Sequence, residues 1–360
     1  MRLVRLLAFF LAAVSGQAAS IQVDRGTLPT GTPYLALKPT GWDQGRVLLF
    51  APAQRGSTQP AEPQLDFASP FVRPLLESGW LVATLAYRRP GVVFLDSIED
   101  LNALRTHLAL THGASDRIYV LGESMGAGLA VRLVENFPDD YAGAVAVGGP
   151  FDLQEPAPTL GVSFAPQRPL LLLPNQSESH APEGYVKAAA RARFAPVLWK
   201  IARDGRTNIN AAEKLTALAA VVNWVENGAP PAPNYDATQP PLPRESAVTF
   251  TADATAAAGQ VLAIDPVRGD LVVNFQPADL ERLGIARGTF FAIAPPTTGA
   301  EPRIIRVLYG QNPRTAKPGD WTALPEAEGW LLLSVHRGQA AAVSGLQVGS
   351  TLTLRRLREK

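Results

Sequence analysis

The residues best suited to chemistry form one short motif, a serine between two glycines at Gly122-Glu123-Ser124-Met125-Gly126. The motif follows an apolar run at 117–121 and opens a helical pattern at 125–137 that begins with small residues. A serine on a strand-turn-helix bend projects its hydroxyl from a sharp turn, where a reacting carbonyl can reach it. Flanking glycines are needed because such a bend is crowded. The motif therefore predicts Ser124 as a nucleophile; the alternative is a helix contact made by small residues.

The elements around this motif alternate between strands and helices. Two short polar strand candidates lie within 20–40, and continuous apolar runs follow at 46–50, 81–85, 117–121, 142–147, 169–173 and 197–201. Amphipathic or small-residue helices separate most of these runs. Uninterrupted apolar strands that alternate with helices are typical of a parallel sheet covered on both faces. The expected fold class is α/β, with a doubly wound, mostly parallel sheet.

The composition changes after this part of the chain. The segment 229–244 carries six prolines and predicts a semi-rigid linker, because it can hold neither a helix nor a central strand. Short β-like runs separated by glycines and prolines then continue to the end, which predicts a small β-barrel or sandwich. We therefore expect an α/β domain at 20–228, a linker at 229–244 and an all-β accessory domain at 245–360.

The first domain resembles the α/β-hydrolase family. With the two polar strands counted first, Ser124 follows the fifth strand, where that family places its nucleophile. The resemblance also rests on Ala86-Tyr87-Arg88, on Glu99-Asp100-Leu101 and on the stretch 135–144, which is similar to secreted esterase-like members. It implies that Ser124 attacks an ester or amide carbonyl and forms an acyl-enzyme. The substrate implied is a small-molecule or polymer ester.

The resemblance also implies two donors for the oxyanion. One is the backbone N–H of Met125, and the other comes from the loop after the third strand, 51–56. Pro52 has no N–H, so Ala53 or Gln54 is the candidate in this loop. The alternative for the loop is an ordinary surface turn.

The base does not follow the family order of serine, acid and histidine. Arg206 stands where the histidine is expected, and arginine stays protonated in proteins. A rearranged triad would take His180 as the base, oriented by Asp152 or Glu178; the alternative is that His180 is a solvated loop residue. The other three histidines are weaker candidates. His107 and His112 are expected on the solvent side of a helix, and His336 lies in the second domain.

The second domain resembles the C-terminal β-barrel of S-adenosylmethionine hydroxide adenosyltransferases. The similar stretches are 260–265, 269–274, 329–340 and 345–350. Asp270 and Val273 replace an asparagine and a threonine of the family motif, and the family's catalytic domain is absent. The resemblance implies a structural module that covers the hydrolase cleft, binds polymer or mediates self-association. Asn274 and Phe275 are the positions to test for a planar ligand; the alternative is a polar strand end and a core aromatic.

The N-terminus predicts an export signal at 1–19. A basic start, an apolar run at 6–14 and small residues at 15–20 favour cleavage near Ala18 to Ser20. The run is too short for a lasting membrane anchor. A periplasmic or secreted location follows; the alternative is a cytoplasmic protein with a hydrophobic first helix. The chain has no cysteine and therefore no disulfide framework.

Charge and histidine spacing limit the partners. The net charge is +1 without basic clusters, which argues against nucleic acid and acidic lipid. The four histidines show no metal-ligand spacing, so neither a metal nor a cofactor is expected. The leading hypothesis is an exported esterase-type serine hydrolase with an accessory β-domain. The alternatives are a catalytically silent hydrolase-fold binding protein and an S-adenosylmethionine-cleaving enzyme.

Overall fold

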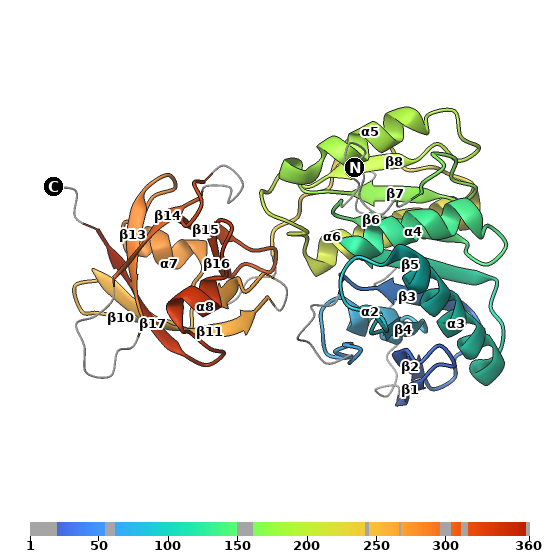
Figure 1. Cartoon of the computed structure of the whole chain (residues 1–360), viewed down its shortest axis with the longest axis horizontal. Coiled ribbons are helices and arrows are strands. Elements are labelled where there is room, and N and C mark those ends of the chain that lie inside the picture. Colours follow the sequence, from blue (N-terminus) through green and yellow to red (C-terminus); the bar gives the residue numbers. More distant parts are fainter. Residues whose placement is uncertain are drawn as a thin grey trace. The chain divides into compact units, whose positions relative to one another are not determined.

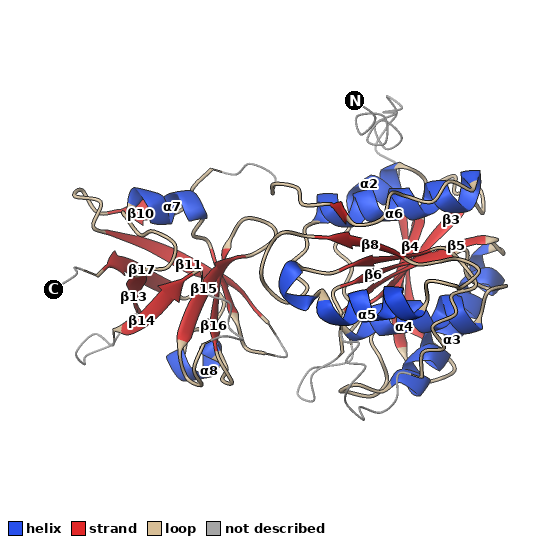
Figure 2. Cartoon of the chain, turned by 90° about the horizontal axis from the view of Figure 1, so that it is seen from above, coloured by secondary structure: helices blue, strands red, loops and turns tan. Residues whose placement is uncertain are grey.

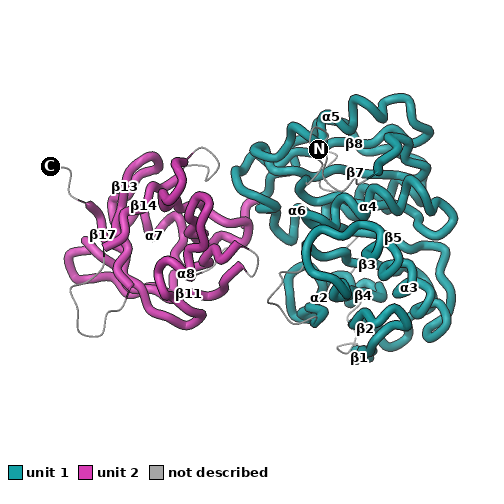
Figure 3. The backbone as a smooth tube through the Cα atoms, in the orientation of Figure 1, with its two compact units in different colours: residues 1–239 teal, residues 240–360 magenta. Residues whose placement is uncertain are grey.

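The computed structural model describes residues 20–54, 62–149, 161–241, 245–265, 268–295, 304–310 and 316–357. The chain divides into two compact units, residues 1–239 and 240–360 (Figure 3). The expected export signal at 1–19 lies outside the described residues.

Unit 1 is built on a nine-stranded sheet (Figure 1). Its strands are β1 (Ile21–Thr27), β2 (Pro33–Pro39), β3 (Arg46–Ala51), β4 (Leu81–Leu85), β5 (Arg117–Glu123), β6 (Gly143–Val147), β7 (Leu170–Leu173), β8 (Val197–Lys200) and β9 (Tyr235–Asp236). The spatial order is β1-β2-β4-β3-β5-β6-β7-β8-β9. β1 and β2 pair antiparallel, as do β2 and β4, and the remaining pairs are parallel. The predicted α/β class with a mostly parallel sheet is confirmed.

Helices cover both faces of this sheet (Figure 2). They are α2 (Val72–Glu77), α3 (Phe94–His112), α4 (Met125–Asn136), α5 (His180–Ala188) and α6 (Ala211–Asn227), with a short 3₁₀ helix, η1 (Gln176–Glu178), after β7. α3, α4 and α5 pack on one face, and α2 and α6 pack on the other. Every residue of β4, β6 and β7 is buried, which explains the uninterrupted apolar runs.

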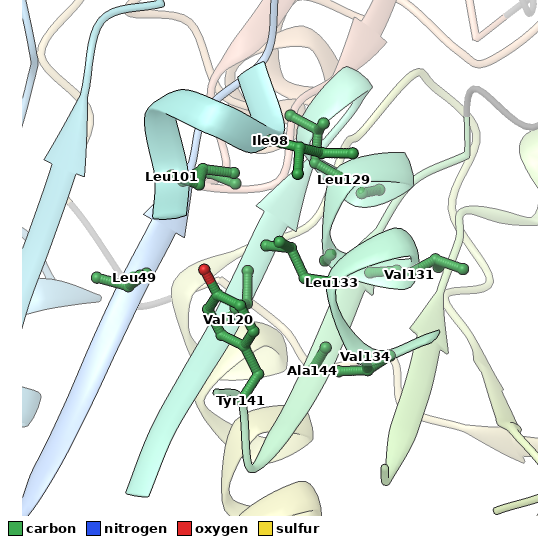
Figure 4. Packing of buried hydrophobic residues seen from close by; sticks show 14 of the residues in the cluster. Leu49, Ile98, Leu101, Val120, Leu129, Val131, Leu133, Val134, Tyr141 and Ala144 are labelled. Atoms are coloured by element: carbon green, nitrogen blue, oxygen red, sulfur yellow. The ribbon is translucent and has the colours of Figure 1, made fainter. Parts of the chain in front are cut away.

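One hydrophobic core of unit 1 joins side chains from strands and helices that are far apart in the sequence. Figure 4 shows Val120 of β5 and Leu49 of β3 beneath Leu133 of α4 and Leu101 of α3. These side chains are fully buried. Burial of a large aliphatic side chain contributes about 1.5–3 kcal/mol, so this contact fixes α4 against the centre of the sheet.

The proline-rich segment divides between the two units. Up to Gln239 it belongs to unit 1. There β9 forms a parallel edge strand beside β8, with Tyr235 opposite Trp199. The Trp199 indole N–H donates to the carbonyl of Ala232 at 2.8 Å, and Ala237 is buried. Prolines are compatible with an edge strand because an edge leaves backbone groups without a ladder partner. The expected linker at 229–244 therefore includes a stretch that packs on the α/β unit.

Unit 2 is a closed β-barrel. Its strands are β10 (Thr249–Phe250), β11 (Ala256–Ile264), β12 (Leu271–Val273), β13 (Phe290–Ala294), β14 (Ile305–Tyr309), β15 (Trp321–Pro325), β16 (Leu331–Val335) and β17 (Thr351–Arg356), and its helices are α7 (Pro277–Arg282) and α8 (Ala340–Ser344). The order β11-β12-β16-β15-β14-β13-β17 closes because β17 also pairs with β11, from Ala256 opposite Arg355 to Gln260 opposite Thr351. The predicted small barrel is confirmed.

The two positions singled out for a planar ligand have structural roles in the barrel. Phe275 is completely buried in the core. Asn274 Oδ1 accepts from the backbone N–H of Gln260 at 2.6 Å, and both side chains lie where a Cβ atom on Gly259 would clash. They match the expected alternative of a polar strand end and a core aromatic.

Candidate active site

Ser124 occupies a strained turn between β5 and α4. Its φ and ψ are 55° and −116°, a combination that costs a non-glycine residue about 1–3 kcal/mol and persists only where the surroundings enforce it. The Ser124 N–H donates to the carbonyl of Val147 on β6 at 3.1 Å. The residue is partly exposed, so its hydroxyl lies at the carboxyl edge of the sheet and not in the packed interior.

The two motif glycines make this turn sterically possible. A Cβ atom on Gly122 would lie 1.9 Å from the carbonyl oxygen of Gly126, and one on Gly126 would lie 2.0 Å from the carbonyl oxygen of Ala51. Both distances are far below van der Waals contact. Glycine is therefore required on both sides of Ser124, as the motif predicted.

The loop after β3 lies against the start of α4. Tyr87, which follows β4, donates its hydroxyl to the carbonyl of Pro52 at 3.0 Å and fixes the loop. Burial, together with the Asp100 carboxylate, raises the pKa of Tyr87 well above its usual range, so the hydroxyl remains a donor. The Ser124 hydroxyl donates to Gln54 Oε1 at 3.3 Å.

The predicted oxyanion residues therefore meet at one edge of the sheet. Met125 is the first residue of α4, where a backbone N–H has no acceptor within its own helix. Gln54 contacts the nucleophile itself, whereas Ala53 is exposed in the same loop. The contact through the Gln54 side chain was not predicted, because the sequence alone does not show which side chain of a loop points at the serine.

The loops after β7 and β8 bring a glutamate and an arginine together. Glu178, at the end of η1, is buried, and its Oε2 accepts from the Thr207 N–H at 2.8 Å. Its other oxygen lies 4.0 Å from Nε of Arg206, whose side chain is 56% exposed. Arg206 is the residue that stands where the resemblance places the base, and Glu178 is one of the two candidate acids, so the structure brings these two predicted positions together.

This glutamate–arginine pair lies close to the Ser124 turn. Gly148 follows the Val147 carbonyl that holds Ser124, and it has a φ of 74°. A Cβ atom there would be 2.8 Å from Thr207 Oγ1 and 3.4 Å from Glu178 Oε2. The loops after β7 and β8 therefore pack on the end of β6, the strand that accepts the Ser124 N–H.

The candidate residues of the rearranged triad are less closely connected. His180 begins α5 and is exposed. Within the described part of the chain, no hydrogen bond joins His180 to Ser124. Asp152 lies outside the described residues.

The other three histidines contact residues that are not part of this candidate site. Nε2 of His112 lies 3.0 Å from Asp24 Oδ2 on β1, and Nε2 of His107 lies 3.4 Å from the same oxygen. The His112 side chain is only 3% exposed, so the expectation of a solvent-facing position was wrong for it; the ring turns toward the Asp24 carboxylate instead. His336 Nδ1 contacts the carbonyl of Ala316 in unit 2.

Two further properties concern the described residues as a whole. Their side chains include no group of three histidines or acids placed to hold a metal ion. None of the helices in this part of the chain combines the length and apolar character that crossing a membrane requires.

The strand order and the turn at Ser124 define unit 1 as an α/β-hydrolase fold. A family model described as serine aminopeptidase, S33, matches residues 92–204, a stretch that contains Ser124. A search of curated proteins found no matching sequence.

Several solved structures are similar to this chain at low identity. An esterase of Pyrococcus furiosus is 18% identical, with 52% of this chain and 87% of that chain covered and a TM-score of 0.39. Oligopeptidase B of Leishmania major is 14% identical, with coverage of 59% and 37% and a TM-score of 0.44. An acylaminoacyl peptidase of Pyrococcus horikoshii is 12% identical, with coverage of 51% and 37% and a TM-score of 0.40. The fold assignment rests on the strand order itself.

Proposed function

We propose that unit 1 is a serine hydrolase that forms an acyl-enzyme through Ser124. The observation that carries the proposal is the strained backbone of Ser124, which holds a partly exposed hydroxyl at the carboxyl edge of the sheet. The hydroxyl oxygen attacks the substrate carbonyl, and the tetrahedral oxyanion is stabilised by the Met125 N–H together with the 51–54 loop.

The proposed base is His180, with Asp152 or Glu178 as its partner. Arg206 cannot take the serine proton, because its guanidinium stays protonated. His180 lies two residues beyond Glu178, at the start of α5, so a small change in this turn would alter its distance from the site. Hydrogen bonds of a catalytic base are often long before substrate binds. The proposed substrates are carboxylic esters, small or polymeric.

A second candidate function is a silent binding protein on the same scaffold. The observation that favours it is the Glu178–Arg206 pair, which gives the family's acid position a cationic partner that cannot act as a base. Such a site would bind its ligand without turning it over, or would do so only at the residual rate that an oxyanion site supports.

A fluorophosphonate probe tests the hydrolase proposal directly. The folded wild-type chain should be labelled at Ser124 and should hydrolyse short-chain p-nitrophenyl esters. Ser124→Ala, with an unchanged thermal unfolding midpoint, should lose both. A folded wild-type protein that neither reacts with the probe nor cleaves any ester of the series would refute the hydrolase proposal and favour the binding protein.

We also propose export and a non-catalytic role for unit 2. The basis for export is the 1–19 segment alone, and N-terminal sequencing of protein from the periplasm or medium tests it, with a mature start near Ser20 expected. Unit 2 is proposed as an accessory or self-association module. Adenosine release from S-adenosylmethionine by the full chain would contradict this role and support the third hypothesis.

A further inference from the structure

A cavity of about 470 Å³ opens on the outer face of the unit 2 barrel. Phe290 of β13 and Arg306 and Leu308 of β14 form one wall, and the segment that leads into β15, with Lys317 and Asp320, forms the other. A cavity of this size lies within the range of sites that take small organic ligands.

The strand pattern explains why these side chains face outward. Phe291 and Val307 are buried in the barrel core, so their neighbours Phe290 and Arg306 point to the opposite side. Phe290 is 40% exposed although it is a large aromatic residue. Because β13 and β14 pair with Phe290 opposite Leu308, the aromatic ring and the aliphatic side chain form a continuous apolar surface.

Arg306 lies flat against this surface. Its guanidinium carbon is 3.7 Å from the centroid of the Phe290 ring, a stacking distance for a cation–π contact. Stacking occupies the faces of the guanidinium and leaves its N–H donors in the plane, directed to the sides. Among the described residues, the side chains of Arg306 and Lys317 form no ion pair.

The Asp320 carboxylate also lines the cavity, and among the described residues it forms no ion pair with Arg306 or Lys317. Asp320 Oδ2 accepts from the backbone N–H of Lys317 at 3.0 Å, so the carboxylate is engaged in the turn that precedes β15. The cavity thus combines two cationic side chains with the part of the Phe290 ring that Arg306 leaves exposed and with the Leu308 side chain. Arginine donors suit carboxylates, and this apolar surface suits a flat ligand body.

We propose that this cavity binds a small aromatic carboxylate, with the carboxylate on Arg306 and Lys317 and the ring against Phe290 and Leu308. The proposal concerns unit 2 alone and does not depend on hydrolysis at Ser124.

The barrel supplies a matched control for Arg306. Arg282 of α7 stacks on Phe250 of β10, with its guanidinium carbon 3.9 Å from the ring centroid, and neither residue lines the cavity. Arg282→Ala therefore removes an equivalent cation–π contact from the same barrel without changing the proposed site.

Calorimetric titration of the full chain with 2-naphthoate tests the proposal. We expect saturable binding to the wild type and to Arg282→Ala, and at least about tenfold weaker binding to Arg306→Ala, the loss expected for a charge-assisted hydrogen bond. The neutral 2-naphthamide should bind at least about tenfold more weakly than 2-naphthoate. Circular dichroism and thermal unfolding should show that both variants are folded.

Three results would overturn the proposal. No saturable binding of 2-naphthoate to the wild type excludes the site. Equal affinity of wild type and Arg306→Ala places binding elsewhere, including the hydrolase unit. Equal affinity for 2-naphthoate and 2-naphthamide shows a plain apolar pocket with no recognition of charge.

Discussion

At the scale of single residues, the turn at Ser124 shows how closely backbone and chemistry are linked in this fold. The serine is held in its strained conformation because glycines on either side let α4 approach the strands and the 51–54 loop. The same approach places Gln54 within hydrogen-bond distance of the Ser124 hydroxyl. Substitution of either glycine should therefore disturb the site by displacing the backbone, because neither glycine has a side chain that could take part in the reaction.

Gly126→Ala should destabilise unit 1 by more than about 3 kcal/mol, the upper end of ordinary overpacking costs. The reason is that the added methyl would meet the Ala51 carbonyl oxygen at 2.0 Å, and a backbone atom cannot move aside as a flexible side chain would. Gly31→Ala is the control, because nothing lies within 4 Å of its Cβ position and only a positive φ of 83° opposes it. That strain costs about 1–2 kcal/mol. Urea unfolding compares the two; equal losses would contradict the packing explanation.

The base can be identified by substitutions at two positions, His180 and Arg206. If the proposed hydrolase uses His180, His180→Ala should lower kcat by at least about 10²–10⁴, the usual contribution of general base catalysis, whereas Arg206→Gln should change it less than tenfold. Initial rates with p-nitrophenyl acetate measure both. If wild type is silent and Arg206→His gains Ser124-dependent activity, position 206 beside Glu178 is the base position and the binding-protein proposal is favoured.

At the scale of elements, the sequence predicted the parallel strands well, whereas the contacts between the loops after β7 and β8 left no pattern in it. Fully buried strands such as β4 and β7 have apolar residues at every position, and the nucleophile turn is local, so both leave a pattern in consecutive residues. Glu178 bonds to the Thr207 N–H, 29 residues later, and no local pattern reports that contact.

The edge strand β1 is attached to α3 through one carboxylate, which predicts a pH dependence. Burial alone raises the pKa of Asp24, but hydrogen bonds from Tyr34, His107 and His112 outweigh burial and lower it. Burial and the Asp24 carboxylate raise the pKa of Tyr34 to about 12. Asp24 therefore stabilises the fold above its unfolded pKa of about 4 and loses this contribution as the pH falls through its lower folded pKa. Tyr34 contributes fully below its unfolded pKa of about 10 and loses its contribution as the pH rises to about 12.

Tyr34→Phe should therefore be less stable than wild type, with the difference largest between about pH 5 and pH 9 and smaller at both extremes. Thermal unfolding across this range measures it. Tyr235→Phe is the control, because the Tyr235 hydroxyl makes no hydrogen bond among the described residues. A difference between Tyr34→Phe and wild type that does not vary with pH would contradict a role for the Asp24 cluster.

At the scale of the whole molecule, each unit has its own hydrophobic core, and the boundary lies between Gln239 and Pro240. The last residues of unit 1 are held by a buried acid. Glu213 Oε1 accepts from the Gln239 N–H at 2.9 Å. The same oxygen forms an ion pair with Arg203 at 2.9 Å, and this pair anchors the loop that carries Arg206. The end of the proline-rich segment and the loop that carries Arg206 thus share one buried carboxylate, that of Glu213.

A chain that ends at Gln239 should fold as a stable hydrolase unit, whereas one that ends at Gly228 should unfold at a temperature lower by roughly 5–10 °C. The shorter chain loses β9, the buried Ala237 and the hydrogen bonds to Trp199 and Glu213, together about 2–3 kcal/mol. Scanning calorimetry of chains starting at Ser20 measures the difference. Equal unfolding midpoints of the two chains would mean that residues 229–239 are a linker that does not stabilise unit 1.

The pairing of β11 with β17 has a consequence for how the barrel can be reused. Ala256 lies opposite Arg355, so the polypeptide enters and leaves this ring of strands at adjacent points, about one strand spacing, or 5 Å, apart. A module with neighbouring ends can be spliced into a surface loop of another protein. Its ends can also be joined and reopened at a different turn while every ladder of hydrogen bonds stays intact.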